Sequence, residues 1–180
     1  ANQTQTFRVV GDPTEGSLLV AAAKAGTPYR EIHEAYPREN EIPFDSERKR
    51  MITVHDIIEP KPDDFSPFYD KKHKGWDIIV VKGAPDVVLE LCTKYQDMND
   101  ETEPLDAKAK KRILDANDAM TADALRVLGL AYRVEKDVPN GEITPEQVEK
   151  DLVFVGLIGM IDPPRMEVAP ALDRARHAGI

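Results

Sequence analysis

Hydrophobic positions along the chain switch between helical and strand-like spacing. Spacing of three or four residues follows Asp12, where Pro13 and Glu15 complete a helix-capping pattern, and it returns after Asp106. These patterns and the proline and glycine stops predict helices near residues 13–26, 85–93, 106–120 and 165–178. Runs rich in β-branched residues predict strands at residues 41–44, 50–58, 76–82, 125–134 and 152–161.

This order of elements predicts an α/β (α+β) fold, with a mainly antiparallel twisted sheet flanked by helices. The strands at 50–58 and 76–82 form a long hairpin whose tip is the proline-containing loop 59–75. The apolar run at 152–161 is typical of a strand buried on both faces. Asp-Pro-Pro at residues 162–164 cannot continue a strand or a helix, so we expect a domain boundary there.

Composition narrows the function classes. The chain has 180 residues, a hydrophobic fraction of 41% and a net charge of -9, from 33 acidic and 24 basic residues. That charge disfavours a general nucleic-acid binder, because phosphate backbones attract basic surfaces. Cys92 is the single cysteine, which excludes an internal disulfide and fits a reducing compartment. No apolar run reaches the roughly 20 residues of a membrane-spanning helix, so any membrane part would lie outside this sequence.

Familiar catalytic motifs are missing from the sequence. There is no Gly-x-x-x-x-Gly-Lys phosphate loop, no Gly-x-Gly-x-x-Gly after a strand and no Gly-x-Ser-x-Gly elbow. The four histidines are scattered, and the cysteine has no partner at zinc-ligand spacing. The local chemistry therefore indicates a binding domain rather than a complete enzyme.

Five short segments, in their order and spacing, point to a family. They are GDPTEG at 11–16, PFDSERKRM at 43–51, VKGAPD at 81–86, LRVL at 125–128 and VGLIGMIDPPR at 155–165. Together they closely resemble the nucleotide-binding domain of P-type cation-transporting ATPases, in the branch of the calcium and sodium pumps. Each segment alone is only modestly specific, but five in series are very specific.

The resemblance implies a domain that holds ATP and delivers it to an aspartate in a separate phosphorylation domain. The family's upstream Asp-Lys-Thr-Gly-Thr nucleophile segment is not in this sequence, nor is the Gly-Asp pair that lies downstream of this domain and helps to bind magnesium. We therefore expect a fragment with no catalytic residue of its own, which alone is inactive. In the intact enzyme it would work with ATP and Mg2+ and contact the phosphorylation and actuator domains, as a cytoplasmic domain of an integral membrane protein.

The resemblance also implies domain limits and a cargo. Residues 1–161 would be the nucleotide-binding domain without its N-terminal part, because few residues precede the GDPTEG segment. Residues 162–180 would be the hinge, carried by Asp162, Pro163 and Pro164, and the start of the phosphorylation domain. The transported ion is taken as calcium from the branch, with sodium, potassium, magnesium and protons left open.

Three candidate site residues lie at the ends of strands. Phe44 matches the family's adenine-stacking aromatic, and its alternative role is to fill the core. Lys82 matches the lysine at the floor of the nucleotide pocket, where Gly83 allows a close approach to the backbone. Lys49 matches a second pocket lysine, although a solvated basic cluster with its two arginine neighbours remains an alternative.

The remaining candidates come from other segments. Glu15 matches the carboxylate that approaches the adenine amino group, but it is also the capping residue of the first helix. Arg126 matches an arginine that reaches the β-phosphate region, with a surface salt bridge as its alternative. Ser46 stands where many calcium-pump members carry arginine and is a candidate hydrogen-bonding partner of the nucleotide.

A second functional hypothesis stays open. The chain could be a stand-alone, non-enzymatic module that binds nucleotide or another protein through the basic cluster and the loop at 59–75. An upstream Asp-Lys-Thr-Gly-Thr segment and hydrophobic spans of about 20 residues would distinguish the pump from this module.

Overall fold

The computed structural model describes residues 11–27, 29–60, 70–136, 138–139, 141–161 and 167–179. Within them, seven strands form one sheet in the order β1-β2-β3-β6-β7-β4-β5, and only the β4–β7 pair is parallel. The strands are β1 (Arg38–Asp45), β2 (Arg50–Asp56), β3 (Asp77–Gly83), β4 (Cys92–Gln96), β5 (Thr102–Pro104), β6 (Arg126–Glu135) and β7 (Leu152–Met160). The predicted α+β class with a mainly antiparallel sheet is confirmed.

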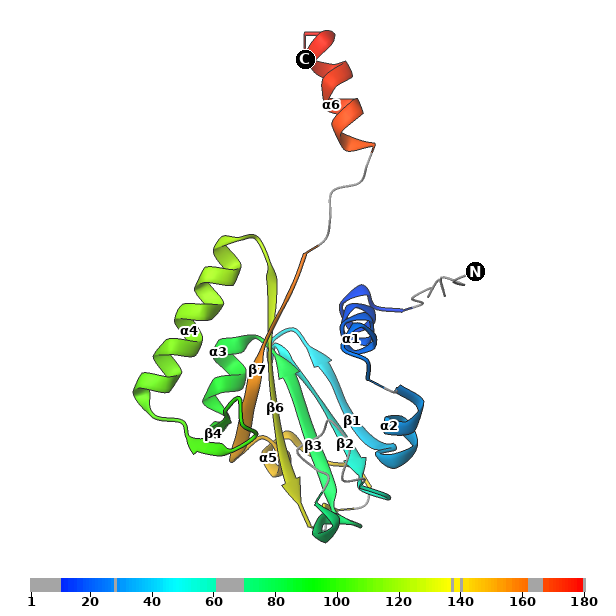
Figure 1. Ribbon diagram of the computed structural model, residues 1–180, viewed down its shortest axis with the longest axis vertical. Coiled ribbons are helices and arrows are strands. Elements are labelled where there is room, and N and C mark those ends of the chain that lie inside the picture. Colours follow the sequence, from blue (N-terminus) through cyan, green and yellow to red (C-terminus); the bar gives the residue numbers. More distant parts are fainter. Residues whose placement is uncertain are drawn as a thin grey trace.

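Helices cover both faces of the sheet (Figure 1). Helices α1 (Pro13–Lys24) and α2 (Tyr29–Ala35) lie beside β1–β3, while α3 (Pro85–Glu90) and α4 (Ala107–Ala122) lie on the other side. Two shorter elements are the 3-10 helix Lys71–His73 and α5 (Pro145–Val148), and α6 (Val168–His177) follows the last strand. Figure 1 shows α6 apart from the sheet, and none of its residues is buried.

Two apolar clusters hold the helices on the sheet. Alternate residues of β3 point to opposite faces, as strand geometry requires. Ile79 and Val81 join the cluster that packs α3 and α5, whereas Ile78 joins the cluster beneath α2. Because both faces of β3 are covered, the register of this strand, the second of the predicted hairpin, is well fixed.

The predicted helix starts at Asp12 and Asp106 are confirmed. The Asp12 carboxylate accepts hydrogen bonds from the backbone N–H groups of Thr14, at 2.7 Å, and Glu15, at 3.2 Å. Asp106 accepts one from the N–H of Ala109 at 2.7 Å. These bonds satisfy N–H groups that have no partner inside the helix.

Five elements were not predicted, and one prediction is wrong. The missed elements are short and have few residues to show a periodic pattern: the 3-10 helix, α2, α5, β4 and β5. Helix α3 ends at Glu90 because the chain turns into β4 at Cys92. The strand at 152–161 is not buried on both faces, since only Leu152 and Phe154 are buried and Val155 is exposed.

Two predictions lie partly or wholly outside the described residues. They are the hinge at 162–164 and most of the hairpin tip, residues 61–69. Among the residues that are described, no helix is both long and apolar enough to cross a membrane.

Candidate functional site

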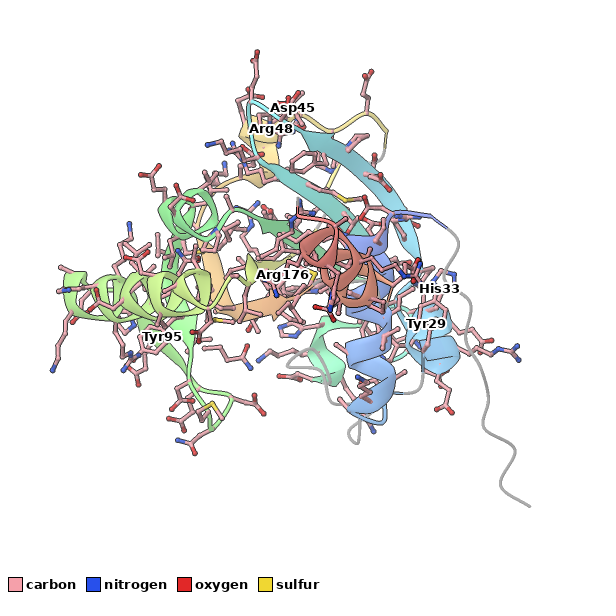
Figure 2. The ribbon with its side chains drawn as sticks, turned by 90° about the horizontal axis from the view of Figure 1, so that it is seen from above. Tyr29, His33, Asp45, Arg48, Tyr95 and Arg176 are labelled. Atoms are coloured by element: carbon pink, nitrogen blue, oxygen red, sulfur yellow. The ribbon has the colours of Figure 1, made fainter. Side chains whose placement is uncertain are left out.

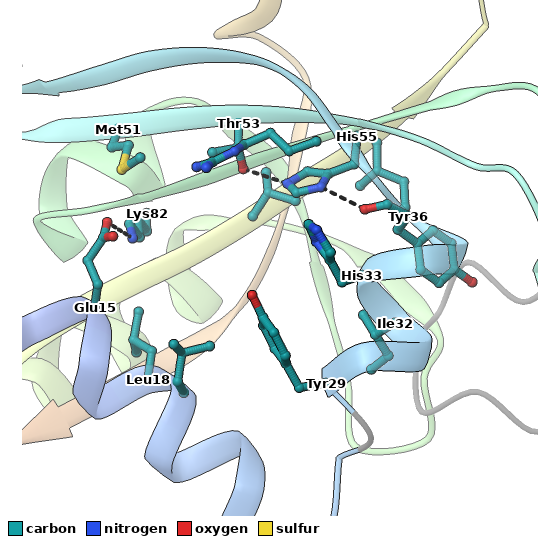
Figure 3. A pocket seen from close by; sticks show the side chains of 14 residues that line it. Glu15, Leu18, Tyr29, Ile32, His33, Tyr36, Met51, Thr53, His55 and Lys82 are labelled. Atoms are coloured by element: carbon teal, nitrogen blue, oxygen red, sulfur yellow. Dashed lines mark hydrogen bonds and ion pairs between the residues drawn. The ribbon is translucent and has the colours of Figure 1, made fainter. Parts of the chain in front are cut away.

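A cavity of about 640 Å³ lies between α1, α2 and the face of β2 and β3 (Figure 3). Glu15 and Leu18 reach it from α1, and Tyr29 and His33 from α2. Two of the predicted site residues, Glu15 and Lys82, line this cavity.

Glu15 and Lys82 form an ion pair at one end of the cavity. The Lys82 Nζ lies 2.5 Å from Glu15 Oε1, and the two side chains are 25% and 50% exposed. Glu15 is placed by the first turn of α1, and Lys82 by its pairing with Met51 across β2 and β3. A partly exposed pair of this kind contributes little to stability, so a ligand can exchange for either partner at small cost. The Glu15 carboxylate pairs with Lys82, which is neither of the two roles considered for it from the sequence.

The other end of the cavity is aromatic. The rings of Tyr29 and His33 stack with centroids 5.9 Å apart and planes 4° apart. His55 Nδ1 lies 3.0 Å from the Tyr36 carbonyl oxygen, and Nε2 lies 2.9 Å from Thr53 Oγ1 (Figure 3). A carbonyl oxygen only accepts, so Nδ1 carries the proton and Nε2 accepts from the hydroxyl. Burial lowers the pKa of His55, which keeps the ring neutral at pH 7.

Phe44, Ser46 and Lys49 lie outside the cavity, at the β1–β2 turn. Phe44 is near the end of β1 with 64% of its surface exposed, so it does not fill the core. Ser46 and Lys49 are exposed in the turn at 46–49. The Asp45 carboxylate shapes this turn by accepting from the backbone N–H groups of residues 47 and 48.

Gly83 connects the turn to Lys82. A Cβ on Gly83 would come within 2.5 Å of the Lys49 carbonyl oxygen and 2.6 Å of Arg50 Cβ, which is too close for any side chain. The next residue, Ala84, donates its N–H to that same carbonyl at 3.0 Å. The atoms that closely approach Gly83 therefore belong to the β1–β2 turn of the same chain. This packing brings the backbone of Lys49 beside the end of β3 that carries Lys82.

Arg126 lies at the same side of α1. At the start of β6, its Nη1 is 3.3 Å from Thr14 Oγ1, one residue before Glu15. The pKa of Asp12 is lowered, chiefly by the hydrogen bond from the backbone of Glu15 and only to a small extent by the charge of Arg126. Lys82 and Arg126 thus each contact the first turn of α1, Lys82 through Glu15 and Arg126 through Thr14, but Arg126 does not line the cavity.

The alternative that residues 48–50 form a solvated basic cluster is wrong for both arginines. Arg48 and Arg50 pair with Glu149, whose side chain is only 8% exposed, and Arg50 Nε donates to Glu149 Oε1 at 2.9 Å. Lys49 is left as the exposed member of the three. Sequence reasoning missed Glu149 because its partners lie about a hundred residues earlier, a separation that no local pattern reveals.

Sequence reasoning also missed the aromatic lining of the cavity. Tyr29 and His33 sit on α2, which was not predicted, and His55 was dismissed as an isolated histidine. The one available signal for α2 is the i,i+4 spacing of Tyr29 and His33, which places both rings on one side of a helix.

Comparison with known proteins identifies the family of this chain. A family model described as the P-type ATPase cytoplasmic domain N matches residues 1–167. The chain belongs to the P-type ATPase family. Within these proteins, the chain corresponds to domain N.

Relatives of this domain N are found in bacteria and in a protozoan. The chain is 37% identical over 179 residues to calcium-transporting ATPase 1 of Bacillus cereus, which covers 99% of the chain and 18% of that protein. It is 40% identical to a calcium-transporting ATPase of Bacillus subtilis, over 94% of the chain and 17% of that protein. A probable calcium-transporting ATPase of Trypanosoma brucei brucei is 34% identical, over 95% of the chain and 18% of that protein. The chain thus spans less than a fifth of the relatives it matches.

The partly buried carboxylate of Glu149 makes a pH-dependent contribution to the stability of domain N. Burial alone would raise the pKa of Glu149, but hydrogen bonds from Arg50 and Arg48 outweigh it and lower the pKa below its ordinary 4.5. A group with a lowered pKa stabilises the fold fully above its unfolded value and loses this effect as pH falls through the folded value. We therefore expect stability to fall less steeply between roughly pH 5 and pH 3 in Glu149→Gln than in the wild type.

Urea unfolding of both proteins across this pH range is the measurement. Asp12 and Asp97, whose pKa values are also lowered by backbone hydrogen bonds, leave a common slope in both proteins. Parallel stability curves for wild type and variant would contradict the stabilising role of Glu149.

Proposed function

We propose that this domain N binds ATP at the end of the cavity where Glu15 and Lys82 meet. The observation that carries the proposal is this ion pair, because two of the five family segments supply its partners and both line the cavity. Phosphate oxygens attract an ammonium group at least as well as a carboxylate does. ATP can therefore compete for either partner: a phosphate oxygen can accept from Lys82, or the adenine amino group can donate to Glu15.

The rest of the proposed site lies on the β1–β2 turn and at the start of β6, outside the cavity. Lys49 and Ser46 on the turn and Arg126 on β6 would contact phosphates, and Phe44 would stack on the base. Gly83 holds the turn against β3, so that Lys49 and Lys82 approach the same ligand. This chain would bind and orient the nucleotide, and an aspartate elsewhere in the intact protein would accept the γ-phosphoryl group.

Mg2+ accompanies ATP in phosphoryl transfer and neutralises phosphate charge. In the ranges that the structure describes, no group of three or more His, Cys, Asp or Glu side chains could hold a metal ion. Because the family's downstream magnesium-binding Gly-Asp pair is not in this sequence, other parts of the intact protein would supply the Mg2+ ligands, and domain N would contribute contacts to the nucleotide.

We further propose that the intact protein is an integral membrane pump that transports calcium, with residues 162–164 as the hinge to its phosphorylation domain. Support comes from the names of the relatives, which are calcium-transporting ATPases several times longer than this chain. The stand-alone regulatory module loses support for the same reason.

The proposed division of labour is tested with radiolabelled ATP. We expect the chain to bind ATP reversibly in calorimetry and to carry no acid-stable label after incubation with γ-labelled ATP and acid precipitation, since the sequence lacks the nucleophile segment. Covalent label on the chain would contradict its role as a binding domain. Absence of any heat of binding would contradict the proposed site.

A further inference from the structure

The β1–β2 turn is tied to a distant part of the chain by one carboxylate. Glu149, which directly follows α5, accepts from the guanidinium groups of both Arg48 and Arg50. Figure 2 shows Asp45 and Arg48 at the edge of the molecule formed by this turn, well away from Tyr95. The carboxylate is nearly inaccessible to solvent, so these are the contacts of a built, partly buried network.

The two sequence neighbours of Lys49 both belong to this network. Lys49 has a φ of 54°, a left-handed conformation that costs energy for a residue with a side chain. Its backbone is held in place by a bond from its N–H to the Asp45 carbonyl at 2.6 Å and by the bond from Ala84 to its own carbonyl. The side chains at 48 and 50 are held by Glu149, and the lysine between them is left exposed.

From this arrangement we propose that Glu149 is a positioning residue for nucleotide binding. This proposal rests on the proposed function. It anchors Arg48 and Arg50 and thereby fixes the turn in the one conformation that presents Lys49 to the phosphates. Glu149 itself does not touch the nucleotide in this account. Its effect on ATP is transmitted through Lys49.

The sign of the effect separates positioning from simple electrostatics. Replacing Glu149 with Gln removes a negative charge near the turn and releases two arginines. Simple Coulomb attraction would then draw the anionic ATP more tightly. Loss of positioning weakens ATP instead, because the turn can leave the conformation that points Lys49 at the ligand.

The test is a calorimetric titration of ATP into wild type, Glu149→Gln and the matched control Glu135→Gln. Glu135 also pairs with a half-buried arginine, Arg133, but at the opposite end of the sheet. We expect Glu149→Gln to weaken ATP about three- to tenfold, the change that loss of one ordinary hydrogen bond corresponds to. The control is expected to bind as wild type does. Tighter or unchanged binding in Glu149→Gln would overturn the proposal.

A double-mutant cycle with Lys49→Ala removes the remaining ambiguity. If Glu149 acts through Lys49, Glu149→Gln has no further effect on ATP in the Lys49→Ala background, whereas general destabilisation would weaken both backgrounds equally. Thermal melts of each variant show whether it is folded, and Glu149→Asp, which keeps the charge, is expected to restore part of the affinity. If the wild type binds no ATP, the proposed function fails. If the wild type binds and the cycle shows independent effects, only the positioning role fails.

Discussion

Lys82→Ala is expected to weaken ATP binding about ten- to 150-fold, the effect of losing a charge-assisted contact worth roughly 1.5–3 kcal/mol. The side chain lies at the end of β3 with a single ion pair to Glu15, so its removal costs the core little packing. The melting temperature should therefore change by only a few degrees, about what loss of a partly exposed ion pair produces.

Calorimetry with ATP and thermal melts measure the two quantities for Lys82→Ala. Lys111→Ala is the matched control, because Lys111 also forms a single ion pair, with Asp115 at 2.8 Å, but on α4. The control should bind ATP as the wild type does. Unchanged affinity in Lys82→Ala together with a large loss of stability would show that Lys82 is structural.

Phe44→Ala is expected to weaken ATP, ADP and AMP alike, by about five- to 150-fold, because stacking of a base on an aromatic ring is worth roughly 1–3 kcal/mol. The ring is largely exposed at the end of β1 and is free to offer a face to adenine. Phe44→Trp should retain binding, because tryptophan offers a larger face. Affinities for the three nucleotides, measured by calorimetry for each variant, check the prediction.

Tyr29 provides a discriminating control for Phe44. It is also an exposed aromatic, at 60%, and unlike Phe44 it lines the cavity, where it stacks on His33. We expect Tyr29→Ala to leave nucleotide affinity close to that of the wild type. If Tyr29→Ala weakens adenine nucleotides and Phe44→Ala does not, the base lies at the aromatic end of the cavity and the assignment of Phe44 is wrong.

Long strands and capped helices could be predicted from the sequence because their signals are local. The β-branched run in β2 and the apolar run in β3 specify a hairpin, and the carboxylates of Asp12 and Asp106 mark helix starts by direct hydrogen bonds. Strand β4 could not be predicted in the same way. Its parallel pairing with β7 joins Cys92 to Leu152, and its stability comes from that distant partner.

The candidate site, too, could be predicted only where its signals are local. Motif segments identified Glu15 and Lys82, which the fold brings to one end of a cavity. They did not indicate that Gly83 is required by the neighbouring turn, or that Glu149 would pair with two arginines. Those contacts depend on sheet register and on the path of the chain around α5, which become visible only in three dimensions.

We propose that adenine nucleotides bind at the β1–β2 turn, the end of β3 and the first turn of α1. Amide chemical-shift mapping of the wild-type chain with ATP, ADP and AMP is the most direct test. We expect shifts concentrated at residues 44–51, 82–84, 14–16 and 126, with similar patterns for the three nucleotides. Shifts concentrated instead at residues 70–75 beside the hairpin tip, or no shifts at millimolar ATP, would contradict it.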